Sequence, residues 1–335
     1  MVDIASVSFL PEQSAWSAVP QLEDGWYPTG GPVDPAADDG LLNWPLKVLG
    51  DRTRWLRDQV EAVTIRQTVT AKVGPGEQFT TINAALEALS RAFPTHVAGG
   101  LSASIQLQPG FIMREQVFVS GVNCGWITIA GLDPMTQIDR AALTRAYGGR
   151  YPAFAAYSGG WLPIIAQLFE MSSAGDGTAR DGILVSGAGS GVRVNDTKGV
   201  RRAGGTALRV VTGGAATAPA ADFREAAEYG IVASGAATVD AAGVNVSAAG
   251  KRGIWANGSA TVNAAGANAT VCVEGGIYAS LGARINADGV NAANPNAADG
   301  QDIVVSTGGI INASGSSGGT SQAPNAVTAS GLIFK

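Results

Sequence analysis

The sequence YGIVA at residues 229–233 recurs as RGIWA at 252–256 and as GGIYA at 275–279, in steps of 23 residues. A fourth copy, QDIVV at 301–305, follows after 26 residues, and the related DGILV at 181–185 precedes the first copy by two steps. A period near 23 residues, with small residues and short β-rich segments, is typical of one coil of a parallel β-helix. The repeat therefore predicts an all-β protein whose chain, from about residue 181 onward, forms an elongated right-handed parallel β-helix.

Alignment of the copies gives each position of the repeat a role. Alternate side chains of a strand point to opposite faces, so the central aliphatic residue of each copy is expected to point into the core. Two inward columns are predicted, one made of Ile231, Ile254, Ile277 and Ile303 and the other of Val239, Val262, Ile285 and Ile311. The second inward column is directly followed by one polar residue per coil: Asp240, Asn263, Asn286 and Asn312.

This polar column predicts a tight corner between two sheets, because Asp and Asn tolerate left-handed backbone and hydrogen-bond locally. Stacked amides also hydrogen-bond from one coil to the next, so a ladder along the repeat is expected. The small residues that follow, such as Ala-Ala-Gly at 241–243, suit such a corner. We interpret the column as structural rather than catalytic.

The residue after each inward isoleucine is expected to point outward, which predicts an apolar column of Val232, Trp255, Tyr278 and Val304. Exposed apolar stripes usually have a partner. One interpretation is a face buried against identical chains in an oligomer. The other is a platform on which Trp255 and Tyr278 stack against sugar rings. The oligomer face is favoured at this point, because the two valines have no obvious use in binding sugars.

Composition limits the classes of function. The chain has 335 residues, of which 46% are hydrophobic and 15% charged, and its net charge is −5. No basic block is present, which argues against binding to nucleic-acid phosphates. Cys124 and Cys272 are expected to be buried core residues rather than a disulfide. No secretory signal and no apolar run of 18 residues is visible, so we expect synthesis in the cytoplasm and no membrane insertion.

The N-terminal residues 1–40 combine breaker residues with large aromatic side chains. A disordered tail is one interpretation, but an arm that docks into a partner better explains the costly residues Phe9, Trp16, Trp26 and Tyr27. Residues 41–70 carry a heptad pattern, which predicts a short self-associating coiled coil, with a trimer as the expected state. Its expected seam consists of Leu42, Leu46, Leu49, Leu56, Val60 and Val63. An amphipathic helix packed on its own domain is the alternative.

The middle of the chain is expected to lead into the β-helix. In residues 71–132 a helix, capped by Thr81 or Asn83, precedes alternating strands and predicts a capping region with the first coils. Residues 133–160 are expected to interrupt the strand pattern with a short helix and an aromatic loop. Residues 161–335 then form the β-helix shaft.

Two stretches resemble a known class of proteins. Residues 27–61 are similar to the particle-binding region of tailed-phage fibre and spike proteins, matching at Asn43, Pro45, Leu46, Leu49, Arg52, Thr53 and Leu56. Residues 73–89, 105–121 and 127–132 resemble the start of phage tailspike and pectate-lyase-like β-helices. The resemblance implies a homotrimeric head or tail spike on the surface of a phage or gene transfer agent. It also implies three kinds of partner: a capsid or tail protein, host capsular polysaccharide and, in some assemblies, a second spike protein.

No convincing catalytic constellation accompanies this resemblance, and no metal or cofactor is expected. A glycosidase needs two carboxylates in a groove, and the weak candidates are Asp222, Glu225 and Glu228. Their spacing is more typical of a solvated helical turn. Arg201 and Arg202 offer a base for a lyase, but no carboxylates are assigned to them. The hypotheses are therefore an adhesin, a depolymerase of the same architecture, or a structural shaft that presents another binding protein.

Overall fold

The computed structural model describes residues 49, 52–57, 64–65, 68–90, 93–94, 102–172, 179–293, 302–317, 327–328 and 331–334. The chain divides into two units, Met1–Ile65 and Arg66–Lys335. In the first unit, Leu49 and residues 52–57 are helical, and the Thr53 hydroxyl donates to the Leu49 carbonyl at 2.8 Å. Leu49 and Leu56 are 47% and 40% exposed in the single chain.

Several predicted residues of the N-terminal region lie outside the described residues. They are the arm residues Phe9, Trp16, Trp26 and Tyr27 and the seam residues Leu42, Leu46, Val60 and Val63. The coiled coil and the docking arm therefore remain predictions.

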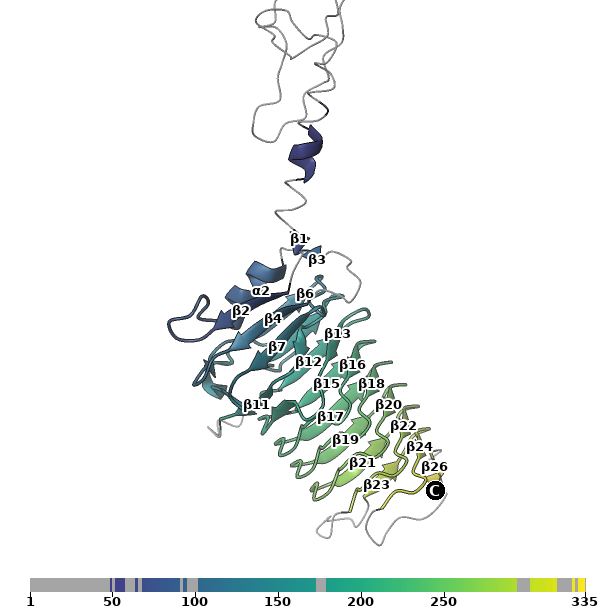
Figure 1. Ribbon diagram of the computed structural model, residues 1–335. Helices are drawn as coiled ribbons and strands as arrows, with labels where there is room; N and C mark the ends of the chain where they lie inside the picture. The colour runs from purple at the N-terminus through teal and green to yellow at the C-terminus, as the bar shows by residue number, and fades with distance from the viewer. Residues whose placement is uncertain are drawn as a thin grey trace, which may run out of the picture. The chain divides into compact units, whose positions relative to one another are not determined.

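The second unit is a parallel β-solenoid of about eight turns with three faces (Figure 1). The first face contains β2 (Val69–Val73), β4 (Ala103–Leu107), β7 (Ile127–Gly131), β10 (Ile164–Ile165), β13 (Gly191–Arg193), β16 (Ala215–Thr217), β18 (Thr238–Asp240), β20 (Thr261–Asn263), β22 (Arg284–Asn286), β24 (Ile310–Asn312), β25 (Val327–Thr328) and β26 (Gly331–Phe334). The second face contains β5 (Ile112–Met113), β8 (Thr136–Ile138), β11 (Leu168–Met171) and β14 (Gly199–Arg201). The third face contains β6 (Val117–Ser120), β9 (Phe154–Tyr157), β12 (Ile183–Ser186), β15 (Leu208–Val211), β17 (Tyr229–Ser234), β19 (Arg252–Ala256), β21 (Gly275–Ala279) and β23 (Ile303–Val305).

Neighbouring coils are joined by parallel pairing on all three faces. On the first face, one sheet ends at β10 and a second sheet begins at β13. An isolated bridge between Ile165 and Val194 links the two sheets. On the second face the sheet ends at β14, and single bridges then continue the stack through Asp222, Asn245, Asn268, Asn291 and Ser317. Two short strands, β1 (Thr64–Ile65) and β3 (Phe93–Pro94), also occur among the described residues.

The register of the third face follows the sequence repeat. Ile231 pairs with Ile254, Ile254 with Ile277, and Ile277 with Ile303. All eight residues of the two predicted inward columns are buried, and they belong to one core cluster that runs from Ala71 to Ile333. These inward assignments are therefore confirmed.

The polar ladder is also confirmed, but its backbone is not as expected. The side-chain amide of Asn263 donates to Asp240 at 2.9 Å, that of Asn286 to Asn263 at 3.1 Å, and that of Asn312 to Asn286 at 3.0 Å. These four residues end strands, and none of them has a positive φ. The left-handed positions at this corner are glycines that lie three residues further on: Gly243, Gly266, Gly289 and Gly315.

Helix α2 (Ile82–Ser90) packs against β2 and β4, where it buries Ile82, Ala85, Leu86 and Leu89. The Thr81 hydroxyl accepts a hydrogen bond from the Ala84 amide at 3.2 Å, as expected of an N-cap residue. The Glu115 carboxylate, which lies between β5 and β6, also accepts from the amides of Ile82 and Asn83. The start of this helix is therefore held partly by a residue that lies 33 positions away in the sequence.

The predicted interruption at residues 133–160 is narrower than expected. Strands β8 and β9 both lie in this range and pair with the neighbouring coils. Only residues 139–153 leave the solenoid path, and they include the short 3₁₀ helix η3 (Arg140–Ala142). We call residues 139–153 the excursion.

One left-handed corner position carries an exposed valine. Val271 has a φ of 59°, which strains a β-branched residue, and its side chain is exposed. Replacing Val271 with glycine is expected to raise the free energy of unfolding by about 0.5–1 kcal/mol in denaturant titration, because the left-handed cost disappears. The matched variant Val273→Gly, at an exposed position without positive φ, is expected to lower it. Equal effects of the two changes would contradict this explanation.

Candidate functional site

The predicted outward column belongs to a longer row on the third face. Pairing of the strands places the following residues in register, one per coil: Phe118, Ala155, Leu184, Arg209, Val232, Trp255, Tyr278 and Val304. We call this set the outward row. Its members differ in accessibility, because other parts of the chain cover some of them.

The excursion lies over the first coils of the third face. The ring of Tyr147 lies 5.1 Å from that of Tyr157, and the guanidinium of Arg145 lies 4.3 Å above the Phe118 ring. Ala155 and Leu184 are buried although they belong to the outward row. The excursion therefore covers the row near β6, β9 and β12.

An ionic network follows where the excursion ends. Arg150, from the excursion, contacts Glu228 at 2.5 Å and Asp181 at 3.6 Å. Asp181 is fully buried and accepts from Arg209 Nε at 2.9 Å, while Lys251 contacts Glu228 at 3.1 Å. We call these five residues the ionic network. It connects the excursion to β12, β15, β17 and β19.

The prediction that Val232 is exposed is wrong. Val232 is 1% exposed, and its register neighbours in the outward row are the longer side chains Arg209 and Trp255. Trp255, Tyr278 and Val304 are half-buried. The outward row is therefore not a stripe of four exposed apolar residues. The preference for an oligomer face rests on the two valines, and Val232 is not accessible for such a contact.

Trp255 and Tyr278 of the outward row form an aromatic platform together with three residues beside the row: Tyr229, Lys251 and Arg252. The rings of Tyr229 and Trp255 lie 5.2 Å apart, and Lys251 Nζ lies 5.4 Å from the Tyr229 ring. The Arg252 guanidinium lies 3.8 Å from the Tyr278 ring and 5.8 Å from the Trp255 ring. Large rings with apolar faces and polar edges beside cations suit a ligand that is both polar and flat.

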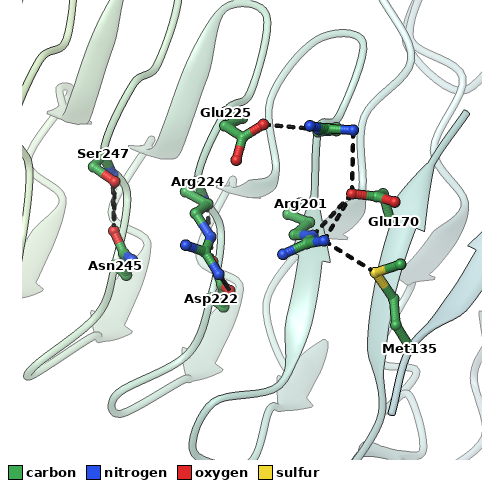
Figure 2. A network of polar contacts seen from close by, with 9 residues as sticks. Met135, Glu170, Arg201, Asp222, Arg224, Glu225, Asn245 and Ser247 are labelled. Atoms are coloured by element: carbon green, nitrogen blue, oxygen red, sulfur yellow. Dashed lines mark hydrogen bonds and ion pairs between the residues drawn. The ribbon is translucent and has the colours of Figure 1, made fainter. Parts of the chain in front are cut away.

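Each of the three carboxylates considered for catalysis lies beside a cation. Residues 222–228 form a bridge and turns rather than the expected helical turn. Asp222 pairs with Arg224 at 2.9 Å, as Figure 2 shows, and Glu225 pairs with Arg202 at 2.7 Å. Glu228 belongs to the ionic network. Each carboxylate thus has a cationic partner, and these contacts hold the turns together.

Figure 2 also shows a carboxylate partner that the sequence reasoning missed. Glu170 contacts Arg201 at 2.9 Å and Arg202 at 3.4 Å, and it accepts from the Gln137 amide at 2.9 Å. Arg201 also donates toward the sulfur of Met135 at 3.2 Å. Because Gln137, Glu170 and Arg201 share a register on β8, β11 and β14, their side chains lie next to one another.

A second polar column was missed although the sequence carries a signal for it. Asp222, Asn245, Asn268 and Asn291 recur at steps of 23 residues and bridge successive coils on the second face. In this column Asn245 accepts from the Ser247 hydroxyl at 2.8 Å, and Asn268 accepts from the Thr270 hydroxyl at 3.0 Å. The column closes local turns, and its role is structural.

Glu170 makes stability depend on pH. Burial acts to raise the pKa of Glu170, but the hydrogen bond from Gln137 and the charges of Arg201 and Arg202 outweigh it and lower the pKa below 4.5. A lowered folded pKa gives stability that is present above pH 4.5 and is lost as the pH falls through the folded value. Replacing Glu170 with glutamine is expected to cost about 1–2 kcal/mol of unfolding free energy at pH 7 and progressively less below pH 4.5.

Denaturant titration of both proteins between pH 3 and pH 7 measures this difference. The control is Glu225→Gln, which alters a more exposed carboxylate that has one arginine partner, and a smaller loss is expected there. A constant loss from Glu170→Gln across the pH range would contradict the expectation.

Further observations limit the chemistry of the site. Within the described part of the chain, no group of three or more His, Cys, Asp or Glu residues is placed to hold a metal ion. Cys124 and Cys272 are buried and do not form a disulfide, as predicted, and burial raises the pKa of each thiol to about 11. No helix among the described residues has the length and apolarity needed to cross a membrane.

No protein-family model matches the chain, and no characterised protein is significantly similar to it in sequence.

Proposed function

We propose that this protein is a spike of a phage-like particle and that its aromatic platform binds polysaccharide on the host cell surface. The observation that carries the binding function is the placement of Trp255 and Tyr278 in register on neighbouring strands. Strand neighbours lie about 4.8 Å apart, so the two half-buried rings lie next to each other at the surface of the third face. The excursion covers the earlier coils of the same face and leaves this part accessible.

The other parts of the proposal concern attachment and assembly. Residues 1–40 attach the spike to a capsid or tail protein of the particle. Residues 41–70 form a trimeric coiled coil, which the helical conformation of residues 52–57 and the exposure of Leu49 and Leu56 support. Residues 71–132 cap the open end of a right-handed β-helix of 23-residue coils, with α2 as the covering element. The resemblance of residues 27–61 to particle-binding regions supports this arrangement.

Binding without cleavage is the favoured form of this function. A glycosidase of the usual kind needs one carboxylic acid and one carboxylate that face the same bond. In the described residues Asp222, Glu225 and Glu228 are each paired with a cation instead. The spike therefore holds the polysaccharide, and depolymerisation is an alternative outcome of the test below.

The test measures binding of the purified full-length protein to capsular polysaccharide from the host. The double variant Trp255→Ala/Tyr278→Ala is expected to weaken binding about 5- to 150-fold, because stacking on each ring contributes about 0.5–1.5 kcal/mol. The control Val273→Ala changes an exposed residue that does not belong to the platform and is expected to bind normally.

Each other result points to a different function. New reducing or unsaturated chain ends would identify a depolymerase instead of an adhesin. No binding to the polysaccharide would favour a shaft that presents another binding protein. Equal binding by the double variant and the native protein would place the binding site elsewhere.

Attachment is tested separately by deleting residues 1–40. The shortened protein is expected to remain trimeric in sedimentation analysis and to be absent from purified particles. Loss of trimers after this deletion would contradict the division of roles between residues 1–40 and 41–70.

A further inference from the structure

Arg252 differs from the other cations on the third face. Arg150, Arg209 and Lys251 each contact a carboxylate at 2.5–3.1 Å in the ionic network. The nearest carboxylate to Arg252 is that of Glu274, and the distance from Nε to Oε2 is 3.5 Å. Arg252 Nε is buried and has no hydrogen-bond partner among the described residues, and its one ion pair there is the long contact to Glu274. Its guanidinium group therefore retains unused donors in the aromatic platform.

The surroundings hold this guanidinium group in place. It lies 3.8 Å from the Tyr278 ring, and the Tyr278 hydroxyl is hydrogen-bonded to the Ser306 hydroxyl at 2.8 Å. The register partner of Arg252 on β21 is Gly275, which has no side chain to compete for the space. A planar cation stacked on a fixed ring loses little freedom when it binds a ligand.

Of the two cations in the platform, Arg252 has the longer contact to a carboxylate: Lys251 contacts Glu228 at 3.1 Å, whereas Arg252 contacts Glu274 at 3.5 Å. A guanidinium group matches a carboxylate best, because two parallel hydrogen bonds can form between the two planar groups.

We infer that the platform selects a polysaccharide of uronic acids, with Arg252 binding the sugar carboxylate and the ring of Trp255 packing against the apolar face of the sugar. This inference rests on the proposed polysaccharide binding and names the class of its ligand. The side chain of Arg252 is 24% exposed, so a ligand reaches it from the platform side without unfolding of the coil. Glu274, which is 44% exposed, competes for the same cation.

The experiment uses the full-length protein and oligosaccharides of galacturonic, glucuronic, mannuronic and guluronic acid, each as the free acid and as the methyl ester. The ester removes the charge and leaves the sugar ring unchanged. At least one free acid is expected to bind, and its ester is expected to bind about tenfold more weakly, which is the scale of one charge-assisted contact. The affinity of the free acid is expected to fall as salt is added.

Three variants assign the effect to single residues. Arg252→Gln is expected to weaken binding of the free acid about tenfold and to leave binding of the ester unchanged. Glu274→Gln is expected to strengthen binding of the free acid several-fold, because it removes the competing carboxylate. Trp255→Ala is expected to weaken binding of both forms. Circular dichroism confirms that each variant is folded.

The outcomes separate this inference from the proposed function. Equal binding of acid and ester, or an unchanged Arg252→Gln variant, would overturn the inference, whereas loss of both ligands in Trp255→Ala would still support a polysaccharide platform. Preference for sulfated over carboxylated sugars would overturn the assignment of a carboxylate. Failure of every free acid to bind would also overturn the inference, and the host polysaccharide test then decides the proposed function.

Discussion

Replacing Arg209 with methionine is expected to lower the free energy of unfolding by about 3–5 kcal/mol at pH 7, because it leaves a buried carboxylate without its nearest cation. Asp181 is fully buried, and Arg209 Nε donates to it at 2.9 Å. The other contacts of the carboxylate are weaker: the Thr206 amide donates at 2.8 Å, and Arg150 lies 3.6 Å away. Methionine keeps an unbranched apolar side chain between Leu184 and Val232, so the loss reports the charge rather than the packing.

The effect of this change is expected to depend on pH. Burial raises the pKa of Asp181, since desolvation outweighs the attraction of Arg209 and Arg150. Removing Arg209 raises this pKa further. A raised pKa in the folded state means that folding favours the protonated form of Asp181. The destabilisation by the charged carboxylate is therefore absent below the ordinary pKa of 3.8, and it grows as the pH rises through the pKa of the folded state. The difference from the native protein is therefore expected to shrink on acidification.

Denaturant titration between pH 4 and pH 8 measures this difference. The control Arg114→Met removes a more exposed arginine that pairs with Asp139 at 3.5 Å, and little change is expected. The double variant Asp181→Asn/Arg209→Met is expected to recover much of the loss, because the unpaired charge is gone. A pH-independent loss without recovery in the double variant would assign the role of Arg209 to packing.

Replacing Gly253 with alanine is expected to lower the free energy of unfolding by about 3 kcal/mol, which is at the upper end of overpacking changes. A Cβ atom on Gly253 would lie 2.7 Å from the carbonyl oxygen of Gly276 and 2.9 Å from the Cβ of Ala269. Gly276 belongs to the next coil, at a distance that parallel pairing fixes, and Ala269 lies on the second face of the same coil, where its amide is bonded to Asn291 of the following coil. Neither backbone can move without disturbing the pairing between coils.

The matched variant Gly266→Ala separates crowding from backbone conformation. Gly266 lies in the same coil and has open space around a Cβ position, but its φ is 68°. The expected loss there is about 1 kcal/mol, which is the cost of a left-handed alanine. A larger loss of unfolding free energy at Gly266 than at Gly253 would mean that the backbone conformation of the corner, and not the close approach of other segments, is the stronger reason for glycine in the repeat.

The repeat determined the core of this protein from sequence alone. Because consecutive coils repeat the same local backbone structure every 23 residues, residues 23 positions apart become neighbours and their side chains point the same way. The buried columns of Ile231 and Val239 and the ladder that begins at Asp240 follow directly from this rule. The same rule would have identified the second polar column that begins at Asp222, had that position been aligned.

The partners of Glu170 and Glu228 were decided only by the tertiary structure. The contacts between Glu170 and Arg201 and between Arg150 and Glu228 join residues 31 and 78 positions apart. These separations are not multiples of the repeat, because the earlier coils differ in length and the excursion folds back over one face. Periodicity carries no information about such contacts.

The exposure of the outward row was likewise decided by neighbours rather than by alternation. A strand pattern determines that Val232 points away from the core, but the side chains on either side determine whether water reaches it. Arg209 and Trp255 flank it, and Leu184, which lies between Ala155 and Arg209 further along the row, is buried too. The sequence by itself thus determined which residues line each face of the solenoid. Only packing between coils decided that Trp255, Tyr278 and Arg252 form the accessible platform, because accessibility depends on side chains distant in the sequence.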